Sequence, residues 1–269
     1  MNVRQSFTWW SFAGRGLDTD GLLSGAARIG YAAVELIPQE LWSRARHFGL
    51  QISAMNGHAS IEEGLNRRAH HERIVRELET NVRMAADQGI PNLICFSGNR
   101  AGQPDGEGAS ITAEVLRRIS PIAEHAGITL VLELLNSRVD HPDYQCDHLQ
   151  WGLDVTKAVN SPAVKLLYDI YHAQVMDGNL IHSIRAHHAS IGHYHTAGCP
   201  GRHELDDTQE IQYPPVLRAI AATGYDGYLA HEFVPTGETL QALRAAYLLT
   251  EQAVSTKDDG REDGVNNVL

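Results

Sequence analysis

The stretch EHAGITLVLEL, residues 124–134, decides the fold. A helical pattern ends at its first residues, Gly127 follows as a helix C-cap, and an apolar run typical of a buried strand begins. The same order of helix end, glycine and apolar strand recurs in RIGYAAVEL, DQGIPNLICF and ATGYDGYLAHE, residues 28–36, 87–96 and 222–232. Helices that alternate with buried strands in this way indicate an α/β protein with a parallel sheet.

Eight apolar strands are predicted along the chain, each followed by a helical pattern. We expect the strands near residues 3–8, 31–36, 50–55, 92–96, 128–134, 164–169, 190–195 and 227–232. The helices are expected near residues 18–29, 38–48, 66–89, 109–126, 147–159, 177–189, 213–223 and 238–255. Eight regular units favour a single (β/α)8 TIM barrel. A doubly wound open sheet is the alternative, but the sequence has no glycine-rich phosphate-binding turn.

Composition and charge narrow the class of protein. The 269 residues are 43% hydrophobic and 20% charged, and the net charge of −11 disfavours nucleic acid as a partner. No apolar run is long enough for a membrane span. The widely spaced Cys95, Cys146 and Cys199 form neither a disulfide framework nor a metal cluster. We therefore expect a soluble cytoplasmic protein that binds neither nucleic acid nor a membrane, with a homo-oligomer left open.

The predicted domain organisation is simple. We expect the barrel to span residues 1–254. Residues 255–269 are polar and rich in Gly and Asp, which predicts a mobile tail or an oligomer arm.

Charged side chains end each of the last four predicted strands. These residues are Glu133, Asp169, His195 and Glu232. Because parallel barrels gather the carboxyl ends of their strands at one rim, the four side chains should converge. Three converging carboxylates would repel one another, and a divalent cation would relieve that repulsion. Three oxygen ligands and one imidazole suit Mn²⁺ or Mg²⁺ best, with Co²⁺, Fe²⁺ or Zn²⁺ as alternatives.

Each of these residues taken alone has a simpler interpretation. Glu133 could be a solvated charge, Asp169 a helix N-cap and His195 a structural histidine. The occurrence of all four at one rim favours the metal site. His193 shares the face of His195 but lies deeper, as support for the site or as core. His172, one helical turn beyond Asp169, is placed to reach a substrate.

Four stretches resemble a known family. They are LELLNSRVDHPDY (132–144), VKLLYDIYHAQVMDGNL (164–180), IGHYHTAGCPGRHE with QEIQYPPVLRAI (191–204 and 209–220), and GYDGYLAHEFVPTGET (224–239). The chain resembles the xylose-isomerase-like barrel superfamily, and within it the hydroxypyruvate isomerase family. Weaker similarity extends through AARIGYAAVELI and GIPNLICFSGNRAG, residues 26–37 and 89–102, so the resemblance covers nearly the whole chain.

The resemblance implies a metal-dependent aldose–ketose isomerase. Its metal would be held by Glu133, Asp169, His195 and Glu232, and the two glutamates would move a proton through an enediolate from opposite sides of the substrate. Arg202 would bind a substrate carboxylate, with a solvated loop arginine as the alternative. Further candidates for substrate binding are His172, Asn136, His58, Trp9, with Trp10 beside it, and Glu204, which could pair with Arg202.

Two departures from the family leave the substrate open. Hydroxypyruvate isomerases often carry Gln where this chain has His195. The loop PGRHELDDTQEIQY, residues 200–213, lacks the glycines of the usual PGRxEPGTGEINY. The substrate could thus be hydroxypyruvate, a 2-oxotetronate or a keto sugar. A 3-epimerase or isomerase of a larger sugar is the main alternative, ahead of an apurinic-site endonuclease-type hydrolase or a non-catalytic sugar-binding barrel.

Overall fold

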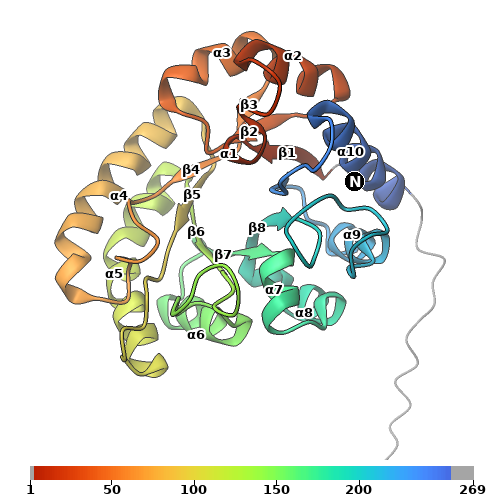
Figure 1. Cartoon of the computed structure of the whole chain (residues 1–269). Coiled ribbons are helices and arrows are strands. Elements are labelled where there is room, and N and C mark those ends of the chain that lie inside the picture. The colour runs from red at the N-terminus through yellow and green to blue at the C-terminus, as the bar shows by residue number, and fades with distance from the viewer. Residues whose placement is uncertain (1–2, 256–269) are drawn as a thin grey trace, which may run out of the picture.

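Parallel strands form a nearly closed barrel in the computed structural model, which describes residues 3–255. Figure 1 shows the strands at the centre and the helices around them. In sheet order the strands are β3, β2, β1, β9, β8, β7, β6, β5 and β4. Their bounds are Arg4–Thr8 (β1), Ala33–Glu35 (β2), Gln51–Ile52 (β3), Ala54–Asn56 (β4), Asn92–Cys95 (β5), Thr129–Glu133 (β6), Val164–Asp169 (β7), Ile191–Thr196 (β8) and Tyr228–His231 (β9). The predicted TIM barrel is confirmed.

A single interrupted strand closes the barrel. β3 pairs with β2, and β4 pairs with β5, so these two short strands stand at opposite ends of the sheet order. They are separated in sequence only by Ser53, whose N–H donates to Val34 O at 3.1 Å. The predicted strand at 50–55 is therefore one segment broken at Ser53, and it connects the two ends of the sheet.

Helices follow the strands in the expected order. Their bounds are Trp9–Phe12 (α1), Thr19–Ile29 (α2), Trp42–His47 (α3), Arg68–Gln88 (α4), Asp105–Ala126 (α5), Leu149–Val159 (α6), Ile170–Met176 (α7), Leu180–His187 (α8), Tyr213–Ala222 (α9) and Thr239–Ser255 (α10). Two 3₁₀ helices occupy Gln39–Leu41 (η1) and His188–Ser190 (η2). Gly89 and Gly127 adopt the left-handed conformation at the ends of α4 and α5, as the sequence predicts.

Two helix predictions differ from the structure. The helix expected at 177–189 corresponds to α8 and η2, whereas α7 begins immediately after β7, lies before the expected range and was not predicted. The side chain of Asp169 caps α7 by accepting the N–H groups of Tyr171 and His172 at 2.8 and 3.1 Å. The short helix α1 was not predicted. Among residues 3–255 no helix is both long and apolar enough to cross a membrane.

The predicted tail begins at Ser255, the last residue of α10, and its remaining residues lie outside the described part of the chain. The division into a barrel and a polar tail therefore stays a proposal.

The loop after β4 packs closely on the loop after β5, and Gly64 makes this possible. A Cβ atom at Gly64 would collide with backbone atoms of Phe96, Ser97 and Gly98. Leu65 N donates to Phe96 O at 3.1 Å, so the two loops also share hydrogen bonds. The close approach leaves no room for a side chain at this position.

We expect Gly64→Ala to lower the free energy of unfolding by about 1–3 kcal/mol, because the backbone must move to admit a methyl group. Urea denaturation would measure the loss. Gly106→Ala is the control, because it lies in α5 with no atom near its added Cβ and should be neutral or slightly stabilising. Equal stability of the two variants would contradict this account of Gly64.

Candidate functional site

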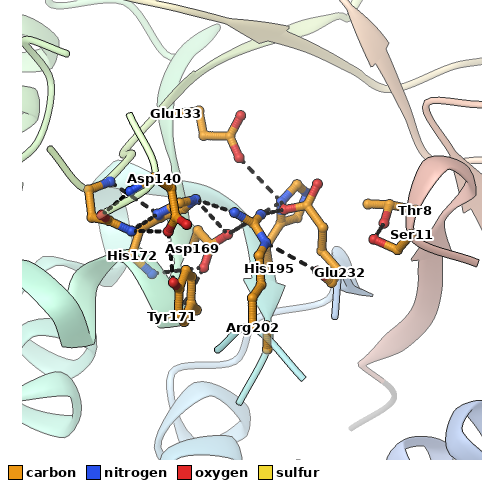
Figure 2. Close-up of polar contacts among 12 residues, drawn as sticks. Thr8, Ser11, Glu133, Asp140, Asp169, Tyr171, His172, His195, Arg202 and Glu232 are labelled. Atoms are coloured by element: carbon orange, nitrogen blue, oxygen red, sulfur yellow. Dashed lines mark hydrogen bonds and ion pairs between the residues drawn. The ribbon is translucent and has the colours of Figure 1, made fainter. Parts of the chain in front are cut away.

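The ends of four neighbouring strands bring four ionisable side chains together. Glu133 ends β6, Asp169 ends β7, His195 lies next to the end of β8, and Glu232 directly follows β9. In the sheet register Asp169 is opposite His195, and His195 is opposite Ala230. Figure 2 shows the four side chains pointing toward one another. All four are buried, so they meet away from bulk water.

The Nδ1 atom of His195 is the common neighbour of the three carboxylates. It lies 2.8 Å from Glu232 Oε2, 3.3 Å from Glu133 Oε1 and 4.0 Å from Asp169 Oδ2. One donor atom from each of the four residues lies within 4.8 Å of the others. Three carboxylate oxygens and one imidazole nitrogen are a donor set that a hard or borderline divalent cation accepts. The cluster could therefore hold a metal ion.

The three carboxylates have very different proton affinities. Burial raises the pKa of Glu133 to about 7, although His195 opposes the change. Burial also raises the pKa of Asp169 to about 6, against the effect of Arg202. At Glu232 burial is outweighed by His195 and Arg202, which lower the pKa to about 2. Near neutral pH the site thus combines an ionised Glu232 with a Glu133 that readily holds a proton.

Two cations balance this concentration of negative charge. Burial alone would lower the pKa of His195, but Glu232 and Glu35 raise it well above the usual value. Arg202 places Nη2 at 2.5 Å from Glu232 Oε2 and 3.3 Å from Asp169 Oδ2. Its backbone is in the left-handed region, with φ of 58°, and Val234 N donates to its carbonyl at 2.7 Å. The loop after β8 thus holds the guanidinium against the cluster.

His172 connects Arg202 to the loop after β6. Its Nδ1 lies 3.0 Å from the backbone N–H of Asn136, and its Nε2 lies 2.7 Å from Arg202 Nη1. Burial and Arg202 lower the pKa of His172 well below the usual value, so the ring is neutral. A neutral imidazole can accept at one nitrogen only, so both contacts cannot be satisfied together.

Asn136 contacts His172 and is not one of the residues that line the neighbouring cavity. Its side-chain amide donates to Asp140 at 2.6 Å, and its Oδ1 accepts the N–H of Val139 at 2.9 Å. Tyr171 also donates to Asp140. Asn136 is fully buried and orients His172, so its direct contact with a substrate is not supported by the geometry.

A cavity of about 430 Å³ opens beside the cluster. Its charged lining residues are Glu62, Glu133, Arg202 and Glu232, and its apolar ones are Trp10, Leu36, Ile61, Phe96 and Leu135. His58 also lines it, with Nδ1 3.0 Å from Ala59 O and Nε2 accepting the N–H of Phe96 at 3.0 Å. Burial lowers the pKa of His58, so the ring is a neutral wall with both nitrogens engaged. A larger hollow of about 600 Å³ lies at the opposite end of β7, away from this cluster.

Two predicted site residues are placed differently from the expectation. Trp10, not Trp9, reaches the site: its Nε1 donates to Glu232 Oε1 at 2.9 Å. Trp9 packs against the core instead, because adjacent helix positions project about 100° apart. Glu204 does not pair with Arg202. Its carboxylate accepts the N–H and hydroxyl of Thr236 at 2.7 and 3.0 Å, which secures the loop after β9.

Glu35 is the residue that the sequence reasoning missed. It ends β2, is fully buried, and lies 2.6 Å from His195 Nε2 and 2.8 Å from His193 Nε2. Burial would raise its pKa, but the two histidines outweigh that effect and lower it below the usual range. The position at a strand end, which identified Glu133, was also present in YAAVEL. His193 is therefore part of the support of the site rather than isolated core.

Comparison with known proteins gives related sequences over most of the chain. The family model described as xylose isomerase-like TIM barrel matches residues 23–250. A human protein provisionally named hydroxypyruvate isomerase is 30% identical over 234 residues, which cover 81% of this chain and 84% of that protein. A 2-oxo-tetronate isomerase of Cupriavidus necator is 32% identical over 142 residues, which cover 52% of this chain and 54% of that protein.

Solved structures share the barrel. An AP endonuclease, family 2, from Brucella melitensis superposes with a TM-score of 0.80 at 24% identity, covering 90% of this chain and 97% of that one. A D-psicose 3-epimerase from Clostridium cellulolyticum superposes with a TM-score of 0.77 at 17% identity, covering 94% of this chain and 99% of that one. At these identities the likeness concerns the fold alone.

We expect the affinity of the protein for Mn²⁺ to fall as the pH is lowered from about 7.5 to about 5.5. Glu133 and Asp169, with pKa values of about 7 and about 6, must lose their protons to bind a cation. Each proton displaced weakens the apparent affinity about tenfold per pH unit below its pKa. Isothermal titration at constant ionic strength would measure the dependence.

Glu133→Gln should bind more weakly and with a shallower pH dependence, since it removes one of the titrating ligands. The exposed Glu40→Gln is the control and should match the wild type. An affinity that is constant over this pH interval would count against the carboxylate cluster as the cation site.

Proposed function

The chain belongs to the xylose isomerase-like TIM barrel family, and from this premise we propose that it is a metal-dependent aldose–ketose isomerase of the hydroxypyruvate isomerase type. The chain is an enzyme of the isomerase class, as the names of its relatives indicate. The substrate is a small hydroxy-carbonyl compound. The bound cation is Mn²⁺ or Mg²⁺, which suit a site made mainly of carboxylate oxygens.

The observation that carries the proposal is the convergence of Glu133 and Glu232 with Asp169 and His195, whose potential ligand atoms lie within 4.8 Å of one another. Within this cluster burial raises the pKa of Glu133, whereas His195 and Arg202 outweigh burial and lower the pKa of Glu232. Such a separation is the pattern expected of an acid and base pair, because one group holds a proton while the other is ready to accept one. Isomerisation of a hydroxy-carbonyl compound requires both roles, since a proton leaves one carbon and returns to its neighbour, while the hydroxyl proton passes to the oxygen of the former carbonyl group.

Different side chains of the site would transfer protons, bind the substrate and exclude water. Glu232, ionised and held by Trp10, removes a proton from the carbon that bears the hydroxyl group. Glu133 handles the returning proton at the neighbouring carbon. His172 and Arg202 hold the substrate oxygens, and the apolar wall formed by Trp10, Leu36 and Phe96 limits the access of water. A divalent cation bound among the four residues would polarise the substrate carbonyl.

The cavity favours one alternative, a 3-epimerase or isomerase of a larger keto sugar. Its volume of about 430 Å³ corresponds to about 14 water molecules of liquid, which exceeds what a three-carbon acid fills. Arg202 supports the acid, because a guanidinium beside the cluster can bind a carboxylate in a bidentate manner. A panel of hydroxypyruvate, 2-oxotetronates and ketohexoses, assayed with added Mn²⁺, would decide between them.

Net charge and free cysteines support two further parts of the proposal, a substrate other than nucleic acid and a cytoplasmic location. The net charge of −11 disfavours nucleic acid as a substrate, which weighs against an endonuclease activity. A cytoplasmic location is part of the proposal, supported by the three free cysteines, Cys95, Cys146 and Cys199, in the described residues.

We expect Glu133→Gln and Glu232→Gln each to lower turnover at least about a hundredfold, because each removes a group that carries a proton while keeping its shape. Both residues are also proposed cation ligands, so activity must be measured with Mn²⁺ at saturation. The exposed Glu40→Gln should retain the activity of the wild type. Near-normal turnover in either site variant would exclude proton transfer by two glutamates.

Substitution of Arg202 should separate an acid substrate from a neutral sugar. A charged hydrogen bond is worth about 1.5–3 kcal/mol, so Arg202→Ala should lower kcat/KM for hydroxypyruvate roughly ten- to a hundredfold. Because Arg202 also contacts Glu232 and Asp169, part of the loss will be common to every substrate. The informative quantity is therefore the ratio of kcat/KM for hydroxypyruvate to kcat/KM for a ketohexose.

Arg202→Lys is the matched variant, since it keeps the charge but not the bidentate geometry. For an acid substrate it should recover only part of the loss. If the wild type, Lys and Ala proteins give the same ratio, Arg202 does not recognise a carboxylate.

A further inference from the structure

Glu35 reaches across the barrel interior to the site. It ends β2, whereas His193 and His195 lie on β8, and β1 and β9 separate these two strands in the sheet. The side chain is fully buried. It is thus a carboxylate in the core of the barrel that contacts a proposed cation ligand from behind, on the side away from the cavity.

Both oxygens of Glu35 are engaged by donors. Oε1 lies 2.6 Å from His195 Nε2. Oε2 lies 2.8 Å from His193 Nε2, and it accepts from the hydroxyls of Ser53 and Ser6 at 2.9 and 3.4 Å. A carboxylate surrounded in this way can only accept, so each histidine must present its proton on Nε2. When His195 loses a proton to bind a cation, the proton on Nε2 is kept by Glu35, and the lone pair is left on Nδ1, the atom that faces the three other carboxylates.

We propose that Glu35 is a positioning residue that fixes the tautomer and the ring orientation of His195 for the cation. This inference rests on the proposed function, because it assigns Glu35 to the same metal site. A carboxylate behind a metal-binding imidazole is a common support for such ligands. His193 completes the arrangement: its ring lies edge-on to that of His195, at 5.2 Å between centroids, and it holds the second oxygen of Glu35.

A purely structural role would predict a different set of effects. A buried ion pair that only stabilises the core would change the stability of the protein and leave its cation affinity unaffected once folded. A positioning role changes cation affinity, because an unsupported imidazole can rotate or move its proton to Nδ1. Cation affinity and the tautomer of His195 are therefore the decisive measurements.

The first experiment is titration of the full-length chain with Mn²⁺ by calorimetry at neutral pH. Glu35→Gln should bind Mn²⁺ about 10- to 100-fold more weakly than the wild type. Glutamine offers one carbonyl oxygen, so His193 and His195 compete for a single acceptor. The exposed Glu40→Gln, which changes charge by the same amount, is the control and should bind like the wild type.

The double variant Glu35→Gln/His193→Phe separates positioning from charge. With the histidine at 193 removed, the single carbonyl oxygen of glutamine is free for His195, while its amide can donate to Ser53. Affinity should then recover at least about tenfold relative to Glu35→Gln. No recovery would mean that the loss came from the missing negative charge, which overturns the inference.

A second measurement needs no variant and so does not depend on the folding of Glu35→Gln. The ¹⁵N chemical shifts of the histidines, recorded on the wild type saturated with Zn²⁺, should show His195 with its proton on Nε2 and its Nδ1 bound. The opposite tautomer would overturn the inference. If the wild type binds neither Mn²⁺ nor Zn²⁺, the metal site of the proposed function fails with it; if it binds Mn²⁺ and Glu35→Gln binds equally, only the role of Glu35 fails.

Discussion

The burial of three converging carboxylates is the constraint on which this site depends. Glu133, Asp169 and Glu232 place oxygens within 4.8 Å of one another, where water screens their repulsion poorly. Such an arrangement persists only if positive charge lies among them or if one group keeps a proton. His195 and Arg202 supply the charge in the structure, and burial raises the pKa of Glu133, which favours a retained proton on that group. The same imbalance favours a cation among the carboxylates, which is the physical basis of the proposed metal site.

Residues at the strand ends both form the cluster and make contacts that hold the cluster in place. Asp169 caps α7 with Oδ1 while Oδ2 points to the cluster, so the helix fixes the direction of the carboxylate. Tyr144 accepts the N–H of Ser97 and donates to Glu133 O, which ties the end of β6 to the loop after β5. Secondary structure thus orients the proposed ligands before any cation is present, so little side-chain entropy would be lost on cation binding.

The strand ends could be predicted from the sequence, whereas the directions of the neighbouring side chains could not. Apolar runs that stop at Glu133, Asp169 and Glu232 place these residues at one rim by period and topology alone. Glu35 satisfied the same rule but ends a strand of only three residues, and its partners on β8 are remote in sequence. The choice of Trp10 over Trp9, and of Thr236 over Arg202 as the partner of Glu204, depends on the rotation of a short helix and on loop conformation. Neither follows from spacing.

The residues proposed for the reaction lie at strand ends, whereas residues proposed to select the substrate lie in loops. The residues proposed for proton transfer and cation binding belong to β6, β7, β8 and the residue after β9, which share one hydrogen-bonded sheet. Arg202 and the wall near Ile61 belong to loops, and Arg202 is held by contacts with the loop after β9 rather than by the sheet. A change in the loop after β8 can therefore alter the shape and charge of the cavity without moving Glu133 or Glu232. On the proposed function, we expect the departures of residues 200–213 from the usual loop to affect the choice of substrate, and the two glutamates to determine the type of reaction.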